Sequence, residues 1–204
     1  MAEILLKSLG RVFGERRVFA DVDLTVEAGE RLLIRGPNGS GKSTLVKIMA
    51  GLLEPTEGRV LYRTEGGEKP PEEVRSEIGY LAPDLVLYEE LTPMENLDFF
   101  ARLRGLPTGR ANLELLDRVG LKDRAEDPVG TFSTGLKQRA KMAFALQNRP
   151  RFLFLDEPGS NLDDLGRDLV RRMVEDHRDP DAVVVIASND PEEFRYGTRT
   201  YELG

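Results

Sequence analysis

A nine-residue stretch, GPNGSGKST at positions 36–44, constrains the fold of this chain more than any other feature. It follows a short apolar run, RLLIR, and it precedes an apolar segment that runs from Leu45 to Leu53. Glycines in such a loop let backbone N–H groups curl around phosphate oxygens, and the helix that follows points its positive end at them. The segment 36–43 matches the P-loop pattern at every defined position. The sequence therefore predicts a buried strand, a phosphate-binding loop and a helix in succession.

The residue types in this loop have separate roles in that interpretation. Lys42 is expected to reach the β- and γ-phosphates of a nucleotide, and the Ser43 hydroxyl is expected to ligate Mg²⁺. An ordinary Gly-rich turn with an exposed lysine is the alternative, and the strand and helix on either side disfavour it. The predicted nucleotide-binding residues of the loop are Gly36, Pro37, Asn38, Gly39, Ser40, Gly41, Lys42, Ser43 and Thr44.

A second motif, FLFLDEP, places an acidic pair after a run of apolar residues. The apolar run predicts a buried strand that delivers Asp156 to its carboxyl end, where the carboxylate is placed to hold Mg²⁺. Glu157 comes next and is predicted to act as a general base that polarises an attacking water. The Asn-Lys-x-Asp motif of guanine-binding proteins is absent from the sequence, so ATP is the expected nucleotide.

Composition sets limits on the class of protein. The 204 residues are 40% hydrophobic, enough for one substantial core, and they include no cysteine, which excludes disulfides and thiolate metal sites. The net charge of −7 argues against a broad nucleic-acid surface, so no nucleic-acid partner is expected. The apolar runs are shorter than the roughly twenty residues that span a bilayer, and the first ten residues do not resemble a signal peptide. Membrane association is therefore expected only through a partner.

The order of the expected elements indicates an α/β fold. Residues 3–35 have the alternating pattern of strands, and a polar loop is expected at residues 64–73. From Thr92 to about Pro150 the pattern becomes helical, beginning with a capping box formed by Thr92 and Glu95. Two more buried strands follow, separated by an amphipathic helix. We predict a P-loop NTPase core with a mostly parallel sheet and flanking helices, an N-terminal antiparallel β part, and an inserted helical subdomain at approximately 84–150.

One octet, FSTGLKQR at 132–139, is not explained by these elements alone. Ser133 and the Gly135 N–H lie at a predicted helix N-terminus, which favours a bound anion. In isolation the simpler interpretation is an N-capped helix whose Lys137 and Arg139 are solvated.

With these motifs in this order, the chain resembles the ATP-binding subunits of ABC transporters along almost its whole length. The resemblance implies that Phe13 stacks on adenine, that Glu157 is the catalytic base, and that Ser160 to Asp163 form the D-loop. It implies a single nucleotide-binding domain over 1–204 that binds ATP and Mg²⁺. It also implies head-to-tail dimers in which the signature residues Ser133 and Gly135 of one subunit cover the ATP held by the other. Such a homodimer or heterodimer would work with an integral membrane permease, on the cytoplasmic face of the membrane.

Two positions depart from the family pattern. Pro83 stands where the family has a glutamine at the hinge before the helical subdomain, with Asp84 next to it as a substitute candidate. Asn189 stands where the family has a histidine; it can donate a hydrogen bond to a γ-phosphate oxygen but cannot carry a proton near neutral pH. We therefore expect slow turnover in the absence of a partner. His177, the one histidine in the sequence, is expected to have a solvated surface role.

The short length and the FSTG-type signature resemble the haem-exporter ATPases of cytochrome c maturation, by analogy only. A permease helix is expected near residues 85–91, although the helical subdomain could cover the same apolar side chains. Three functions remain open at this point: an ATPase that drives a permease, a module that dimerises on ATP but scarcely turns over, and a soluble ABC-type ATPase acting on ribosomes or DNA. The acidic balance and the single P-loop disfavour the third.

Overall fold

The computed structural model describes residues 2–177 and 179–204. The strands are β1 Glu3–Phe13, β2 Arg16–Val26, β3 Arg31–Arg35, β4 Glu57–Thr64, β5 Gly67–Lys69, β6 Ile78–Leu81, β7 Phe152–Asp156, β8 Val183–Ala187 and β9 Arg199–Glu202. The α-helices are α1 Lys42–Met49, α2 Pro93–Leu103, α3 Arg110–Arg118, α4 Thr134–Leu146 and α5 Asp164–Asp176. Short 3₁₀ turns cover Pro71–Glu77, Lys122–Arg124, Val129–Thr131 and Glu193–Tyr196.

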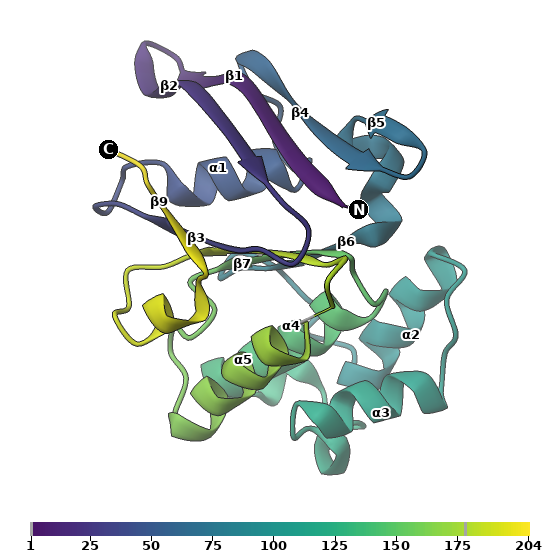
Figure 1. The fold of residues 1–204 in the computed structure, drawn as a ribbon. Coiled ribbons are helices and arrows are strands. Elements are labelled where there is room, and N and C mark those ends of the chain that lie inside the picture. The colour runs from purple at the N-terminus through teal and green to yellow at the C-terminus, as the bar shows by residue number, and fades with distance from the viewer. Residues whose placement is uncertain (1, 178) are drawn as a thin grey trace.

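The strands form an antiparallel sheet and a parallel sheet, as the sequence predicted. The antiparallel sheet has the order β2-β1-β4-β5, and the parallel sheet has the order β6-β7-β8-β3-β9. Figure 1 shows α1 between the two sheets, with α5 and the helices α2, α3 and α4 on the opposite side of the parallel sheet. The P-loop lies between β3 and α1, at the edge where the parallel strands end.

Strand periodicity divides the buried residues into two clusters. In β3, Leu32 and Ile34 pack toward α1 and the antiparallel sheet, whereas Leu33 between them packs toward the helices α2 to α5. The same alternation holds in β7, where Phe152 and Phe154 belong to the first cluster. Because successive side chains of a strand point to opposite faces, the parallel sheet is buried on both sides. The helical segment therefore shares its hydrophobic core with α5 rather than enclosing one of its own.

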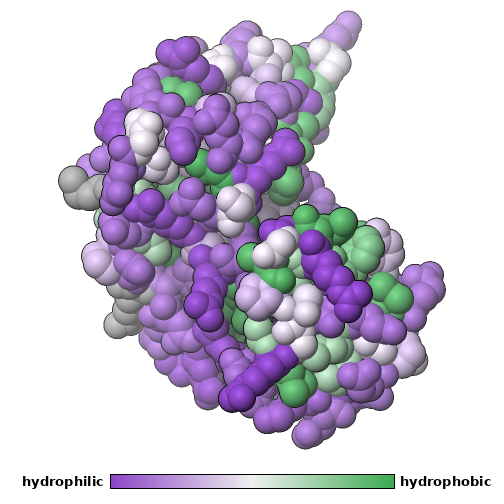
Figure 2. Space-filling model, turned by 90° about the vertical axis from the view of Figure 1, so that its right-hand side faces the viewer, coloured by the Kyte–Doolittle hydropathy of each residue, from purple (hydrophilic) through white to green (hydrophobic). Residues whose placement is uncertain are grey.

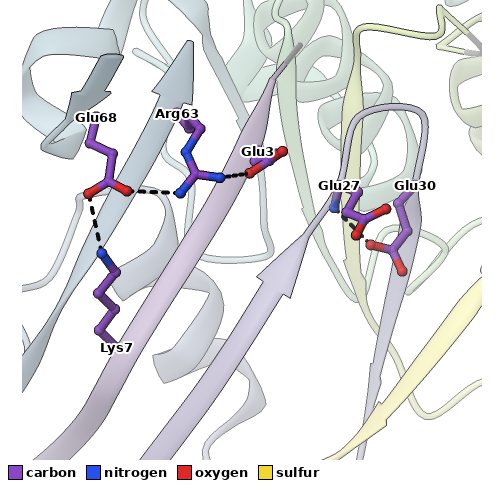
Figure 3. A network of polar contacts seen from close by, with 6 residues as sticks. All are labelled: Glu3, Lys7, Glu27, Glu30, Arg63 and Glu68. Carbon is purple, nitrogen blue, oxygen red and sulfur yellow. Dashed lines mark hydrogen bonds and ion pairs between the residues drawn. The ribbon is translucent and has the colours of Figure 1, made fainter.

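The outer face of the antiparallel sheet carries a charged network (Figure 3). Arg63 on β4 bonds Glu3 on β1 at 2.6 Å and Glu68 on β5 at 2.9 Å, and Lys7 on β1 bonds Glu68 at 3.2 Å. These contacts raise the pKa of Arg63 and lower the pKa of Glu68, chiefly through the hydrogen bond between the two side chains. The network crosses three strands and so favours their observed pairing.

Several local predictions are confirmed and two are wrong. Thr92 and Glu95 form the capping box at the start of α2, with Pro93 at its first position. The first helix is shorter than predicted, because α1 ends at Met49 and Gly51 adopts a positive φ of 68°. The expected loop at 64–73 contains the short strand β5, which pairs with β4. No helix in the described part of the chain is long and apolar enough to span a bilayer.

Candidate nucleotide-binding site

The P-loop adopts backbone angles that few residues other than glycine tolerate. Gly39 and Gly41 have φ values of 81° and 104°. A Cβ atom on Gly41 would lie 2.4 Å from Cγ1 of Val18, and one on Gly36 would lie 2.2 Å from the carbonyl oxygen of Leu203. The glycines at 36 and 41 are therefore required by space as well as by φ. Because the N-cap residue of α1 is glycine, no side chain covers the first N–H groups of the helix.

Lys42, the first residue of α1, is 7% exposed. Its Nζ donates hydrogen bonds to the carbonyl oxygens of Gly36 at 2.9 Å and Pro37 at 3.2 Å. The ammonium group thus lies across the loop that it follows, held by neutral acceptors. A phosphate oxygen is a stronger acceptor for the same group because the hydrogen bond is then between ions.

A cleft of about 500 Å³ opens beside this loop, and most of the predicted nucleotide ligands line it. Phe13, at the end of β1, is 46% exposed there, and the guanidinium of Arg11 lies 4.2 Å from the centre of its ring. One face of Phe13 is therefore occupied, and a base can stack only on the other. The lining residues are Phe13, Arg16, Val18, Asn38, Gly39, Gly41, Lys42, Ser43, Thr44 and Glu157.

Asp156 at the end of β7 is 4% exposed, and its carboxylate accepts a hydrogen bond from the Ser43 side chain. The Oδ1 atom of Asp156 is buried and has no hydrogen-bond partner among the described residues. Burial raises the pKa of Asp156, while the Ser43 hydrogen bond opposes that shift. A buried carboxylate oxygen without a partner, next to a hydroxyl, is the oxygen donor set that Mg²⁺ prefers. The residues present fit the predicted metal.

Glu157 follows on the same strand end and has a left-handed backbone, with φ of 45°. Non-glycine residues adopt this conformation at a cost of roughly 1–2 kcal/mol, so its surroundings must hold it. Burial raises the pKa of Glu157, whereas Lys42 and a hydrogen bond from the backbone N–H of Asn189 lower it. Glu157 lines the cleft together with Lys42 and Ser43.

Asn189 contacts the P-loop directly. Its Nδ2 donates to Oδ1 of Asn38 at 2.6 Å. This hydrogen bond places the segment after β8 against the loop before α1. The amide carries two hydrogens, so the one that does not bond Asn38 can still donate to a γ-phosphate oxygen.

At the hinge, Asp84 lies close to Asp156, which is one of the predicted metal ligands. Lys47 of α1 forms an ion pair with Asp84 at 2.5 Å, and Asp84 raises the pKa of both Tyr80 and Asp156, after the larger effect of burial. Pro83 contributes its carbonyl oxygen to Lys141 of α4 at 2.6 Å. An acidic side chain is thus present where the family glutamine is missing, one residue later in the chain.

The signature residues lie outside this cleft. Ser133 is the N-cap of α4 and accepts a hydrogen bond from the Leu136 N–H at 3.3 Å, and Gly135 faces the Asn161 carbonyl oxygen. Arg139 is not solvated: it is buried and binds Asp163 with contacts of 2.9 and 3.2 Å. Lys137 pairs with Glu89. Neither Ser133 nor Gly135 lines the cleft of its own chain.

Sequence reasoning missed some residues and misassigned one. Arg16, which donates to the Gly39 carbonyl at 3.4 Å, lines the cleft because the turn after Phe13 returns the chain to the same edge. His177 is not a solvated surface residue. It is half-buried, its ring nitrogens lie 3.2 and 3.3 Å from the carbonyl oxygens of Met173 and Pro150, and burial lowers its pKa.

A second and larger depression of about 940 Å³ lies between α1, β6, the hinge and α4. Leu85, Val86 and Phe144 contribute apolar surface to it, and Val86 is 79% exposed. Figure 2, viewed from the side that carries α2 and β6, shows a hollow with hydrophobic side chains along its lower rim. Within the segment 85–91, Leu87 is buried, so the protein itself covers that side chain, whereas Tyr88 is exposed.

Comparison with known proteins gives one consistent result. A family model described as ABC transporter matches residues 19–160. The lantibiotic transport ATP-binding protein SrtF of Streptococcus pyogenes is 33% identical over 184 residues, which is 90% of this chain and 79% of that protein. The cytochrome c biogenesis ATP-binding export protein CcmA of Rhizobium meliloti is 37% identical over 204 residues, covering 98% and 97%.

Solved structures agree with the sequence comparisons. A dimeric bacterial ABC transporter cassette superposes with a TM-score of 0.86 at 28% identity, over 98% of this chain and 94% of that one. A dimeric ATP-binding cassette in a post-hydrolysis state, bound to ADP and Pi, superposes with a TM-score of 0.86 at 27% identity, with the same coverage of both chains.

Proposed function

The chain belongs to the ABC transporter family, and on that premise we propose that it binds MgATP, hydrolyses it, and drives a separate membrane permease. One observation carries this proposal. Lys42, Ser43, Asp156 and Glu157 come from two strand ends that are separated in the sheet by β8, and they converge on one edge. In open α/β sheets, ligands bind outside the carboxyl ends of the strands.

In the proposed reaction, Glu157 accepts a proton from the water that attacks the γ-phosphorus. The bond from that phosphorus to the β,γ-bridging oxygen breaks, and ADP and phosphate are released. Its raised pKa makes it a better base than an exposed glutamate. Lys42 leaves the carbonyl oxygens of the loop and binds the β- and γ-phosphates, while the N–H groups of the loop offset the charge that develops on the phosphate. Ser43 and Asp156 would hold Mg²⁺, which would neutralise charge shared by the same phosphates.

The dimer belongs to the same proposal. The N-terminus of α4 favours an anion, and neither Ser133 nor Gly135 lines the nucleotide cleft of its own chain. A second subunit, packed head to tail, would bring its bound γ-phosphate to Ser133 and Gly135. The bacterial ABC transporter cassette with a TM-score of 0.86 is dimeric, which supports dimerisation of this chain.

The test uses Glu157→Gln, which removes the base but keeps the size of the side chain. With saturating MgATP this variant should double in mass by light scattering, since hydrolysis no longer dissolves the dimer. Glu157→Gln combined with Ser133→Glu should remain monomeric, because a carboxylate at the start of α4 repels a γ-phosphate. Persistent monomers of the single variant would overturn the proposed dimer.

We propose that the permease docks in the 940 Å³ depression. A short amphipathic helix would fit a groove with an apolar rim and charged residues such as Arg75 and Arg104 at its edges. Val86→Asp should abolish co-purification with the permease identified from the neighbouring genes, while basal ATPase activity is retained. Binding that survives this change would place the permease elsewhere. On this proposal the chain is peripheral on the cytoplasmic face of the membrane.

The cargo is proposed to be haem, in cytochrome c biogenesis. The relative with that printed role matches this chain along nearly its whole length, at 37% identity. The lantibiotic relative at 33% identity supports a different exporter branch almost as well. Expression with its permease in a host that lacks the cytochrome c export ATPase separates them: restored holocytochrome c supports haem, and its absence despite active ATPase supports another cargo.

A second function has its own support. Pro83 lacks a side-chain acceptor, and Asn189 is bonded to Asn38 and cannot carry a proton. A module that dimerises on ATP but hardly turns over would have these two features. Multiple-turnover phosphate release by the native chain distinguishes it from the ATPase.

A further inference from the structure

A buried glutamate outside the cleft contacts the loop that follows Glu157. Glu193 begins the 3₁₀ turn after β8 and is 3% exposed. Its Oε1 accepts a hydrogen bond from the backbone N–H of Gly159 at 2.7 Å. Its pKa is raised by burial and lowered by hydrogen bonds from Ser188 and Gly159. A carboxylate is rarely buried this fully without a partner that requires it.

The contact is close on both sides. A Cβ atom on Gly159 would lie 2.2 Å from Oε1 of Glu193, so position 159 must lack a side chain for the carboxylate to approach. The φ of Gly159 is not in the left-handed region, so the glycine is explained here by space and not by backbone angle. The hydrogen bond between Glu193 and the Gly159 N–H therefore depends on a glycine at position 159.

This contact is one of several that hold residues 157–160. The Glu157 N–H donates to the Ala187 carbonyl oxygen at 2.8 Å, and the Ser160 N–H donates to the Glu157 carbonyl oxygen at 3.1 Å. From the other side, Gln138 of α4 donates to the Pro158 carbonyl oxygen at 3.2 Å. Left-handed backbone at a glutamate persists only where the surroundings determine it. Among the contacts that hold residues 157–160, the one from Glu193 is made by a carboxylate.

We propose that Glu193 is a positioning residue for ATP hydrolysis: by holding the Gly159 N–H, it fixes the backbone of Glu157 so that the carboxylate faces the cleft. Glu193 itself does not line the nucleotide cleft. This inference rests on the proposed function, in which Glu157 is the general base. Since Glu193 follows Asn189 on the segment that touches the P-loop, it also ties the position of the base to that segment.

The test separates the acceptor from the volume of the side chain. Glu193→Met keeps the length and removes the acceptor, and its kcat should fall by about tenfold or more, with KM for MgATP within about twofold. Glu193→Gln retains an acceptor oxygen and should restore kcat to within about threefold of the native rate. Gly159→Ala adds a methyl group that displaces the Glu193 carboxylate, so its kcat should fall as in Glu193→Met. Glu192→Met, at the exposed neighbouring position, is the matched control and should leave both constants unchanged.

Hydrogen–deuterium exchange of residues 157–162 in the full nucleotide-free chain is the second measurement. Exchange should be faster in Glu193→Met than in the native protein and unchanged in Glu192→Met. A native kcat in Glu193→Met, or equal losses in the Met and Gln variants, would overturn the inference. If the native chain shows no turnover, the proposed function fails. In that case the exchange measurement still tests the role of Glu193, and unaltered exchange of residues 157–162 in Glu193→Met would refute it.

Discussion

Replacing Asp156 by asparagine should stabilise the nucleotide-free protein and weaken its response to MgATP. The native carboxylate is 4% exposed, and its Oδ1 has no partner among the described residues. Leaving a buried polar group unsatisfied costs about 1–3 kcal/mol, and more when the group is charged. An asparagine still accepts the Ser43 hydrogen bond without carrying the charge. Because the amide leaves its own N–H groups unpaired, we expect a net gain of about 1 kcal/mol, or roughly 2–4 °C in Tm for a chain of this size.

In the presence of MgATP, the native protein should be more stable than Asp156→Asn. At a MgATP concentration of about 100 times Kd, the native protein gains about 2.7 kcal/mol by linkage. The asparagine variant offers Mg²⁺ a neutral oxygen and should gain much less. Burial raises the folded-state pKa of Asp156, so the penalty of its ionised form grows as pH rises through the window between the unfolded and folded pKa values. Below that window both proteins are neutral at this position, and their difference should shrink.

The assay is thermal unfolding by circular dichroism, with EDTA and with MgATP. Asp117→Asn is the control, because Asp117 is exposed and its ion pair with Lys122 should be worth less than about 0.5 kcal/mol. An Asp156→Asn protein that is less stable than the native chain in EDTA would refute the electrostatic reasoning. Equal stabilisation of both proteins by MgATP would refute the assignment of Asp156 to the metal.

Four further predictions concern the same site. Asn189→His should raise kcat by about tenfold, since imidazole can carry a proton and asparagine cannot; phosphate release at or below the native rate would count against this. Gly41→Ala should destabilise the fold by about 2 kcal/mol in urea titrations, because its methyl group would meet Val18 and its φ is 104°. The kcat should decline with falling pH through the raised pKa of Glu157, since only the ionised carboxylate accepts a proton, and the acid limb should lie above the range of an exposed glutamate. Phe13→Ala should weaken ATP binding by about tenfold in fluorescence titrations through lost stacking, and unchanged affinity would mean that the base lies elsewhere.

The sequence predicted the parts of the site that depend on local pattern. Strand, glycine loop and helix follow one another without interruption around residue 40, so the P-loop could be recognised from spacing alone. The capping box at Thr92 is equally local. The C-terminal end of α1 was misjudged, because Leu52 and Leu53 continue the apolar pattern while Gly51 turns the chain. The strand β5 was missed since its only hydrogen-bonded neighbour is β4, and its own residues are polar.

Other site features depend on tertiary contacts that no spacing reveals. Glu193 is ordinary in sequence, and only the approach of Gly159 from another strand end makes its carboxylate a partner. His177 was misassigned because its burial comes from the segment around Pro150, which lies 27 residues away. Arginine in a helix is usually solvated, yet the Arg139 guanidinium donates to the carboxylate of Asp163, the N-cap residue of α5. In each case the decisive atom belongs to a distant part of the chain.

The position of Lys42 has a consequence for the rate of nucleotide capture. Its amine is already withdrawn from bulk water and rests on two carbonyl oxygens of the loop. When a triphosphate binds, the Lys42 ammonium exchanges the two carbonyl oxygens for phosphate oxygens, which are stronger acceptors. The side chain does not first have to be ordered. Most of the entropic cost of placing this cation has therefore been met during folding, and association should be limited by diffusion into the cleft rather than by rearrangement of the loop.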